Sequence, residues 1–212
     1  MELIAPPGVY RPQNDTWMLA EAVATAGVRD ADVLDVGTGT GALAIAALQS
    51  GARSATGLDV SAKAIAAAWL NARRHRVPLR VRRGDIRNLR NQQYNVVLSN
   101  PPYVPSMLAQ ASGAARAWDA GVDGREILDP LCSSVNRLLR PQGFLLLVQS
   151  VLSHPEVSVR MLREAGLDAD IVERRTLPFG PVLRGRAKWL ERRDLIEPGQ
   201  RSEELVVIRA QR

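Results

Sequence analysis

The sequence predicts an α/β fold, with a mostly parallel, seven-stranded sheet and helices on both of its faces. Short apolar runs that are typical of strands alternate with Ala- and Leu-rich segments that are typical of helices. Apolar residues make up 46% of the 212 residues and charged residues 24%, which is the balance of a globular protein. No repeat or long linker divides the chain, so we expect a single domain over residues 1–212.

The first half of the chain contains four of the expected strands. A helix is expected over residues 16–26, with Asn14 or Asp15 as its N-cap. A short strand over residues 32–36 ends in glycines, and an Ala/Leu-rich helix follows it over residues 42–49. The remaining elements expected in this half are a strand at 54–58, a helix at 62–74, an alternating strand at 79–83 and a buried strand at 94–99.

The second half is expected to complete the sheet. The elements expected are a helix at 125–139 stopped by Pro141, a strand at 144–148, a helix at 156–164 closed by Gly166, and strands at 169–174 and 205–209. About 30 residues join the last two strands without an obvious crossover helix. We therefore expect these strands to close one edge of the sheet as an antiparallel hairpin, with an Arg-rich insertion at 176–202 before the last strand.

Charge and composition indicate which partners and which cellular compartment the protein has. The net charge is +6 and nearly all the basic residues are Arg, which favours RNA, DNA or a ribosome-associated partner. An Arg-biased genome explains the same excess equally well. The N-terminus lacks the pattern of a secretory signal, and the longest apolar run, at 143–148, is far shorter than the roughly 20 residues that cross a bilayer. Cys132 is the only cysteine, so we expect a cytoplasmic protein without a cysteine-built metal site and without membrane contact.

A glycine-rich loop follows the first strand. Gly37, Gly39 and Gly41 let the backbone turn sharply and approach a ligand, while the next helix presents its amide-rich end. This pattern alone also fits a nicotinamide dinucleotide. However, Asp35 lies just before the glycines, where its charge would face an incoming pyrophosphate. A cationic ligand end suits this position better, such as the amino group of S-adenosylmethionine.

Three aspartates follow three successive strands. Asp35, Asp59 and Asp85 can serve, in that order, the amine, the ribose diol and the adenine amino group of S-adenosylmethionine. Each of them alone is explained as a helix cap or turn residue, but together with the glycine loop they predict a cofactor site. The residues that we assign to this site are Thr16, Asp35, Gly37, Gly39, Gly41, Asp59, Val60, Asp85, Ile86 and Asn100.

A rigid polar motif follows the fourth strand. Asn100, Pro101, Pro102 and Tyr103 are the predicted catalytic residues. The prolines fix the backbone, so the Asn100 side-chain oxygen and the Pro101 carbonyl can accept both hydrogens of one planar NH2 group, on which Tyr103 can stack. Catalysis would be mainly orientation. The long loop from Pro105 to Ala120, which includes Trp118, is a candidate substrate lid.

These motifs together resemble a known family. The loop from Asp35 to Gly41 with Asn100-Pro-Pro-Tyr103 resembles nitrogen-directed methyltransferases that act on adenine, cytosine or glutamine. Tyr10-Arg-Pro12 and Asp15-Thr16 resemble the N-terminal segment of the HemK family, and residues 117–126 resemble its short-chain branch. The resemblance implies a Rossmann-like class I methyltransferase fold, with residues 1–30 closing over S-adenosylmethionine and Thr16 contacting it.

The acceptor is also implied by this resemblance. Short-chain HemK enzymes methylate the glutamine N5 of the Gly-Gly-Gln loop in a peptide-chain release factor, and a small zinc-binding partner activates them. Because 212 residues are taken up by the methyltransferase fold, we expect no helical N-terminal domain of the kind that the long bacterial form carries. Two other acceptors stay open, namely adenine N6 in RNA or DNA and a protein lysine.

The segment 174–193 also has two interpretations. Its arginines, with Phe179 and Trp189, are suited to contact nucleic acid or a release factor. Alternatively, the segment forms a solvated helix that packs Leu183, Ala187 and Leu190 on the sheet.

Overall fold

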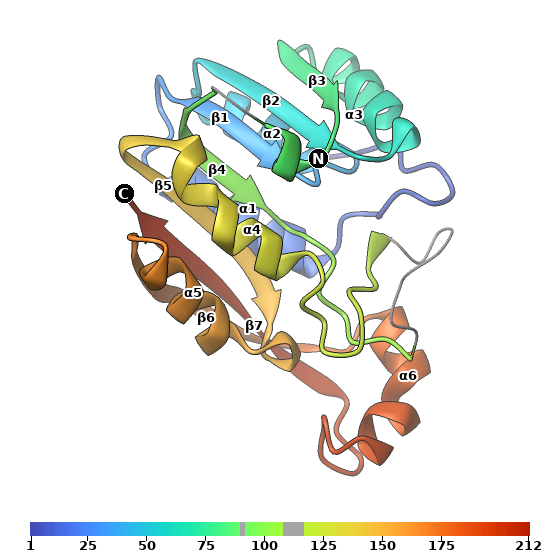
Figure 1. Ribbon diagram of the computed structural model, residues 1–212. Coiled ribbons are helices and arrows are strands. Elements are labelled where there is room, and N and C mark those ends of the chain that lie inside the picture. The colour runs from blue at the N-terminus through green and yellow to red at the C-terminus, as the bar shows by residue number, and fades with distance from the viewer. Residues whose placement is uncertain (90–91, 108–116) are drawn as a thin grey trace.

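The centre of the molecule is a seven-stranded sheet. The computed structural model describes residues 1–89, 92–107 and 117–212. The strand order is β3-β2-β1-β4-β5-β7-β6 (Figure 1). The strands are β1 Asp32–Val36, β2 Ser54–Asp59, β3 Leu79–Arg83, β4 Tyr94–Ser99, β5 Leu139–Ser150, β6 Asp168–Pro178 and β7 Ser202–Gln211. Strands β1 to β5 are parallel to one another, and β7 is antiparallel to both β5 and β6. The predicted mostly parallel sheet with an antiparallel closing hairpin is confirmed.

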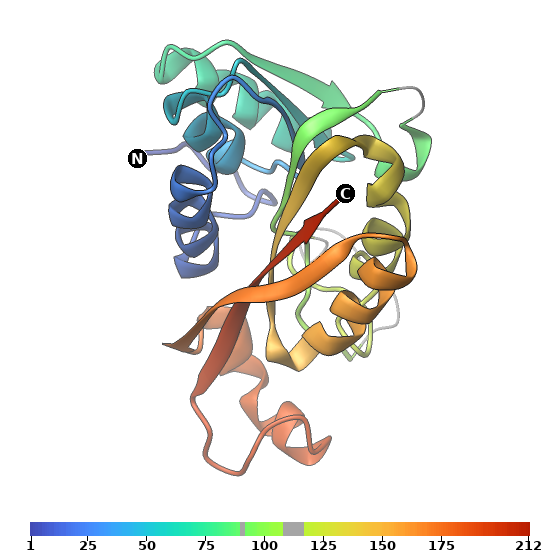
Figure 2. The ribbon, with the colours of Figure 1, turned by 90° about the vertical axis from the view of Figure 1, so that its left-hand side faces the viewer.

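Helices cover both faces of the sheet. The α-helices are α1 Asn14–Thr25, α2 Ala42–Gln49, α3 Ala62–Arg74, α4 Leu128–Ser134, α5 Pro155–Glu164 and α6 Pro181–Arg192. Short 3-10 turns are η1 Ile86–Asn88, η3 Val135–Leu138 and η4 Val151–Ser153. Helices α1, α2 and α3 lie on one face and α4 and α5 on the other, so the molecule has three layers (Figure 2).

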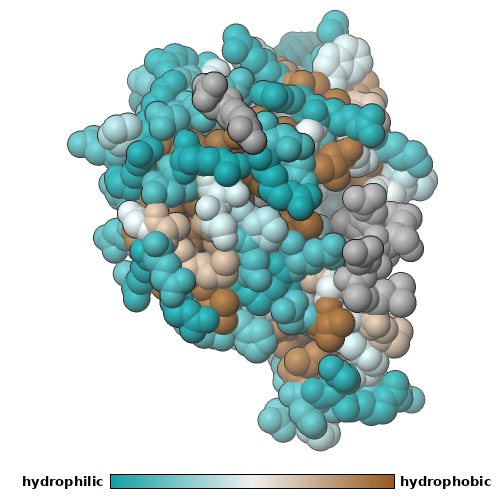
Figure 3. Space-filling model, in the orientation of Figure 1, coloured by the Kyte–Doolittle hydropathy of each residue, from teal (hydrophilic) through white to brown (hydrophobic). Residues whose placement is uncertain are grey.

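The core lies on both sides of the central strands. Val97 and Leu98 in β4 and Leu145 in β5 are fully buried, as expected for parallel strands covered on both faces. Each such side chain contributes about 1.5–3 kcal/mol of burial free energy. The face of the molecule in Figure 3 is largely hydrophilic, with apolar residues in small separate patches. Within the described residues, no helix is long and apolar enough to cross a membrane.

The predicted N-cap of the first helix is wrong. Helix α1 begins at Asn14, and its N-cap is Gln13, which makes no side-chain capping bond. Asp15 is already inside the helix and buried. Its Oδ1 accepts from the Thr16 amide within the first turn, whereas its Oδ2 is engaged by side chains that lie outside the helix.

The predicted helix over residues 125–139 is also too long. Helix α4 begins at Leu128, because the Arg125 side chain is drawn into a buried position where it donates to the carbonyls of Ser153 and His154. The turn η3 ends at residue 138, and Pro141 lies inside β5. Proline is tolerated there because the pairing of β5 with β4 shifts register in this stretch.

The last two strands are longer than predicted, and helix α6 lies between them. Leu183, Ala187 and Leu190 of α6 are buried, so the predicted helix and its apolar positions are confirmed, but the helix does not lie on the sheet as expected (Figure 1). Phe179 is buried, and Trp189 packs against the core. In Figure 1, α6 lies beyond the end of the sheet, next to the loop that follows β4.

Candidate active site

The predicted site residues follow strands that end at one edge of the sheet. β1 lies between β2 and β4, and β3 lies beside β2, so the segments that follow these parallel strands are neighbours. The Ser99 hydroxyl donates to the Val36 carbonyl at 2.9 Å and ties the ends of β4 and β1 together. In open α/β sheets this carboxyl edge is where ligands bind.

The glycine loop is held open by its backbone conformation. Gly37 and Gly39 have positive φ angles of 73° and 54°, which other residues rarely adopt. A Cβ on Gly37 would meet no atom within 4 Å, so there is free space beside it. Gly41 is different, because a Cβ there would lie 3.2 Å from Ala68 of α3. The structure therefore places Gly41 in helix packing and leaves space for a ligand at Gly37 and Gly39.

Asp35 carries an unused carboxylate oxygen. Its Oδ2 accepts hydrogen bonds from the Thr38 hydroxyl at 2.6 Å and from the Ala44 amide at 3.2 Å. Its Oδ1 is buried and has no hydrogen-bond partner among the described residues. Burial raises the pKa of Asp35 to about 7, with a further contribution from Asp59. A buried orphan oxygen of this kind is costly unless a ligand donates to it.

Asp59 braces the glycine loop from the next strand. Its Oδ2 accepts from the Gly39 amide at 3.0 Å and its Oδ1 from the Ser61 amide at 2.8 Å. Burial raises its pKa. Val60, which follows directly, is about half exposed, so its side chain can contact a ligand.

Asp85 is brought to the same edge but is already paired. The Gly84 amide donates to the Asp59 carbonyl at 2.9 Å, which places the segment after β3 beside that after β2. The Asp85 carboxylate caps η1 and pairs with Arg87 at 2.6 Å, and this pairing lowers its pKa. Ile86 is buried. An adenine amino group would have to share Asp85 with Arg87.

A buried carboxylate links the N-terminal helix to the acceptor motif. Asp15 Oδ2 accepts from the Tyr10 hydroxyl at 2.9 Å, the Tyr103 hydroxyl at 3.0 Å and the Asn100 amide nitrogen at 3.0 Å. Its Oδ1 accepts from the amide of Thr16 at 2.6 Å. Burial, followed by the charge of Asp15, raises the pKa of both tyrosines, so both remain donors.

These contacts fix which end of the Asn100 amide is free. Its nitrogen donates to Asp15 and to the Thr16 hydroxyl at 3.1 Å. Its oxygen accepts no hydrogen bond from the described part of the chain, and can therefore accept from a ligand. Pro101 is buried and Pro102 is half-buried. The Tyr103 hydroxyl is committed to Asp15, so only the ring of this buried residue can contact an acceptor.

Sequence reasoning missed two carboxyl groups at this place. The sequence predicts only a helix cap for Asp15. Its contacts with two tyrosines and an asparagine become visible only when the fold brings these residues together. Glu203 of β7 is buried, with an unpartnered Oε2 among the described atoms. Burial raises its pKa to about 7, and the nearby charge of Asp15 adds to the shift.

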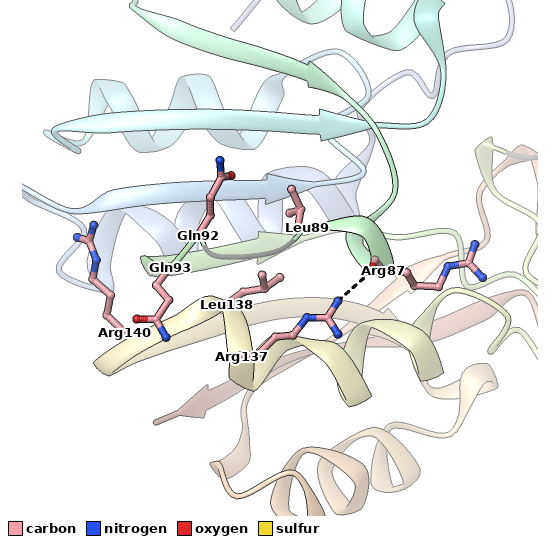
Figure 4. Close-up of a pocket in the computed structure, with 7 residues that line it drawn as sticks. All are labelled: Arg87, Leu89, Gln92, Gln93, Arg137, Leu138 and Arg140. Atoms are coloured by element: carbon pink, nitrogen blue, oxygen red, sulfur yellow. Dashed lines mark hydrogen bonds between the residues drawn. The ribbon is translucent and has the colours of Figure 1, made fainter.

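A hollow in the surface lies away from these residues. It has a volume of about 840 Å³ and lies beside β4 and η3. The residues that line it are Arg87, Leu89, Gln92, Gln93, Arg137, Leu138 and Arg140 (Figure 4). None of the predicted site residues is among them. The two groups of polar residues around Asp35 and Asp15 are therefore the better candidates for the site of chemistry.

Comparison with known proteins identifies the family. Residues 1–165 match the model of the methyltransferase small domain family. The chain belongs to this family. It is a methyltransferase that uses S-adenosylmethionine as the methyl donor. The nicotinamide alternative that the glycine loop allowed is thereby removed.

Several individual methyltransferases are similar to this chain over most of its length. A Methanocaldococcus jannaschii protein, provisionally named a protein N5-glutamine methyltransferase, is 31% identical over 84% of this chain and 90% of its own. The human methyltransferase HEMK2 is 29% identical over 75% of this chain and 79% of its own. The Deinococcus radiodurans release factor glutamine methyltransferase is 33% identical over 87% of this chain, which spans 66% of that relative.

A solved structure shares the fold. Mtq2 of E. cuniculi, in complex with Trm112, superposes with a TM-score of 0.69 at 23% identity, over 97% of this chain and 99% of its own. The Rossmann-like methyltransferase fold predicted from the sequence is confirmed.

The residues at the sheet edge fit S-adenosylmethionine. The orphan Asp35 oxygen can accept from its amino group, and the space beside Gly37 and Gly39 admits a ligand close to the backbone. When bound, the cofactor supplies an activated methyl group on a sulfonium sulfur.

We expect Asp15→Asn to slow methyl transfer. If the new amide nitrogen replaces Oδ2, three donors lose their acceptor; if it replaces Oδ1, it meets the Thr16 amide, which is also a donor. Hydrogen bonds to charged groups contribute about 1.5–3 kcal/mol, so a loss of roughly 10- to 100-fold in kcat is expected. Glu21→Gln, on the exposed side of the same helix, is the matched control in the steady-state assay. An unchanged kcat in Asp15→Asn would show that the carboxylate is dispensable.

We expect cofactor affinity to decline as the pH falls below 7. The pKa of Asp35 is about 7, so acid converts the ionised carboxylate that attracts the amino group into a neutral one. Isothermal titration calorimetry measures the affinity for S-adenosylhomocysteine between about pH 5.5 and 8. This range extends roughly one unit or more on each side of the Asp35 pKa.

Asp35→Asn is the control for this effect. It keeps an oxygen for Thr38 and Ala44, and we expect weak binding that changes little with pH. Asp59, whose pKa is also raised, is retained in both proteins. Equal pH dependence in the two proteins would assign the effect to Asp59 or another group.

Proposed function

We propose that this enzyme works in the cytoplasm and methylates the side-chain amide nitrogen of a glutamine, in the Gly-Gly-Gln loop of a peptide-chain release factor. One observation carries the proposal. The Asn100 nitrogen is bound by Asp15 and Thr16, so the Asn100 oxygen is the end that remains for the acceptor.

The acceptor chemistry fits a planar NH2 group. The Asn100 oxygen and the Pro101 carbonyl accept one amide hydrogen each, which sets the plane of the amide. An amide nitrogen is a poor nucleophile, and no basic side chain in the motif can activate it. Asn100 and Pro101 act by holding the amide nitrogen against the methyl group and excluding other orientations. The rate gain from such alignment of two reactants is large. In the transfer, a nitrogen–carbon bond forms, the carbon–sulfur bond breaks and one amide proton is released.

Other acceptors suit the residues less well. A lysine ammonium has three donors in a tetrahedral arrangement, and it must lose a proton before it can react. The adenine N6 amino group has the same planar shape as an amide, and the net charge of +6 favours nucleic acid. However, Phe179 of the Arg-rich segment is buried and Trp189 is partly buried against the core, so this segment exposes little aromatic surface on which bases could stack.

The names of relatives support a protein substrate and a partner protein. The Deinococcus radiodurans relative is a release factor glutamine methyltransferase, and Mtq2 with Trm112 is responsible for methylation of the termination factor eRF1. We therefore include a small zinc-binding activator in the proposal, and the assay should be run with and without one.

The decisive experiment identifies the methylated atom. Purified enzyme is incubated with labelled S-adenosylmethionine and either a release factor or total RNA, and the products are digested and analysed by mass spectrometry. We expect one methyl group on the loop glutamine and none on adenine. A release factor with this glutamine replaced by alanine serves as the substrate control. Label in adenine, or label retained in the alanine variant, would contradict the proposal.

We expect Asn100→Ala to abolish transfer while S-adenosylhomocysteine still binds. Misplacement of an acceptor costs on the order of 100-fold in rate, whereas the cofactor keeps its contacts at Asp35 and the glycine loop. Calorimetry and single-turnover transfer separate the two effects. Transfer that survives at saturating cofactor would show that Asn100 does not orient the acceptor.

A further inference from the structure

Helix α6 reaches the loop that follows the acceptor motif through one arginine. The Arg186 guanidinium lies 2.6 Å from the Asp119 carboxylate and donates to the Pro105 carbonyl at 3.0 Å. Asp119 is 4% exposed and Arg186 19% exposed at their side chains, so the pair is largely removed from solvent. The buried Asp119 Oδ1 has no aligned hydrogen bond among the described residues, so its contact with Arg186 is a close ion pair, while the contact with Pro105 is a hydrogen bond. Removing one member of the pair alone would leave a buried charge unpaired.

The two residues that Arg186 contacts lie on opposite arms of one loop. The Val104 amide donates to the Trp118 carbonyl at 3.0 Å, the Ala120 amide to the Val104 carbonyl at 3.1 Å, and the Ser106 amide to the Gly121 carbonyl at 2.9 Å. These bonds make a short parallel ladder between residues 104–106 and 118–121, with Val104 paired to Asp119. Residues 108–116, which belong to the predicted substrate lid, lie outside the described residues.

Arg186 completes this ladder from the side. Successive carbonyls along an extended segment point in opposite directions, so the Val104 carbonyl faces the second arm and the Pro105 carbonyl faces away from it. The Arg186 guanidinium donates to this outward carbonyl through one nitrogen and pairs with Asp119 of the other arm through the other. A planar guanidinium presents a separate nitrogen to each partner, whereas an ammonium would have to serve both from one nitrogen.

The ladder is continuous with the acceptor motif. Val104 follows Tyr103 directly, and Gly124 packs so closely on the Tyr103 carbonyl that a Cβ would lie 2.4 Å from it. At its other end, α6 begins beside the N-terminal segment: a Cβ on Gly180 would lie 3.2 Å from Gln13 Oε1, and Gln13 donates to the Tyr10 hydroxyl. Helix α6 therefore touches both the acceptor loop and the segment that carries Asp15.

We propose that Arg186 is a positioning residue, which fixes the backbone from Tyr103 to Pro105 and thereby the acceptor motif, without contacting the acceptor itself. The inference rests on the proposed acceptor role of Asn100 and its neighbours. It adds a residue from outside the parallel part of the sheet, in a segment for which the sequence indicated either a solvated helix or a contact with nucleic acid or a release factor.

The test compares three variants. Arg186→Met with Asp119→Asn removes both charges, so that neither is left buried alone. Arg186→Lys keeps the positive charge but loses the two-nitrogen fork that reaches Pro105 and Asp119 separately. Arg184→Ala, on the same helix, removes an exposed arginine that has no partner among the described residues, and is the matched control.

We expect the double variant to lose about 10- to 100-fold in kcat/KM for the acceptor, with unchanged affinity for S-adenosylhomocysteine. Arg186→Lys should recover part of this loss, and Arg184→Ala should match the wild type. Hydrogen exchange should accelerate at the amides of Val104, Ser106 and Ala120, and stay unchanged in the central strands. A general destabilisation would accelerate exchange in the central strands as well, and would overturn a specific positioning role.

The exchange measurement needs no acceptor, so it separates this inference from the proposed function. If the wild type fails to methylate a release factor, the proposed function fails, and exchange at the ladder still reports on Arg186. Normal exchange at the three amides, or faster exchange with unchanged kcat/KM on an acceptor that the enzyme does use, would overturn the inference.

Discussion

The buried carboxylate of Asp15 is the interaction on which the arrangement of the site depends. It collects hydrogen bonds from Tyr10, Asn100 and Tyr103, which come from two segments separated by more than 80 residues of sequence. A carboxylate without these donors would be strongly unfavourable in such a buried place, and the donors without it would lose their common acceptor. The N-terminal helix and the tail of β4 are therefore held in one relative position.

The sheet supplies the frame in which this interaction is useful. β1 and β4 are neighbours, and the Ser99 hydroxyl joins their ends, so the glycine loop and the Asn-Pro-Pro-Tyr motif lie next to each other. One group of polar residues centres on Asp35 and the other on Asp15. Each contains an oxygen that is unused within the described chain, on Asp35 in the first and on Asn100 in the second. In the proposed function, a cationic donor on one side and a planar amide on the other would use these two oxygens.

The sequence predicted most of the fold because the information was local. The apolar runs at 32–36 and 94–99 coincide with strands of the structure, and the glycines mark the turn after β1. The start of α4 was missed because Arg125 is drawn into contacts with residues 28 or more positions later, which no local pattern encodes. The role of Asp15 was missed for the same reason, since its partners are distant in sequence. Gly41 was assigned to the cofactor, although its packing against Ala68 is visible only in three dimensions.

The closing hairpin extends beyond the rest of the sheet. The pairing of β7 with β5 stops at Leu205, whereas its pairing with β6 continues to Ser202. The connection that bears α6 is therefore mounted on an overhanging ribbon instead of on the central strands. Leu183, Ala187 and Leu190 anchor this connection in the apolar core, so these positions must stay apolar for the helix to keep its place. The exposed positions of α6 carry no such requirement, so related enzymes can change them, and with them the surface beside the acceptor loop, without repacking the interior.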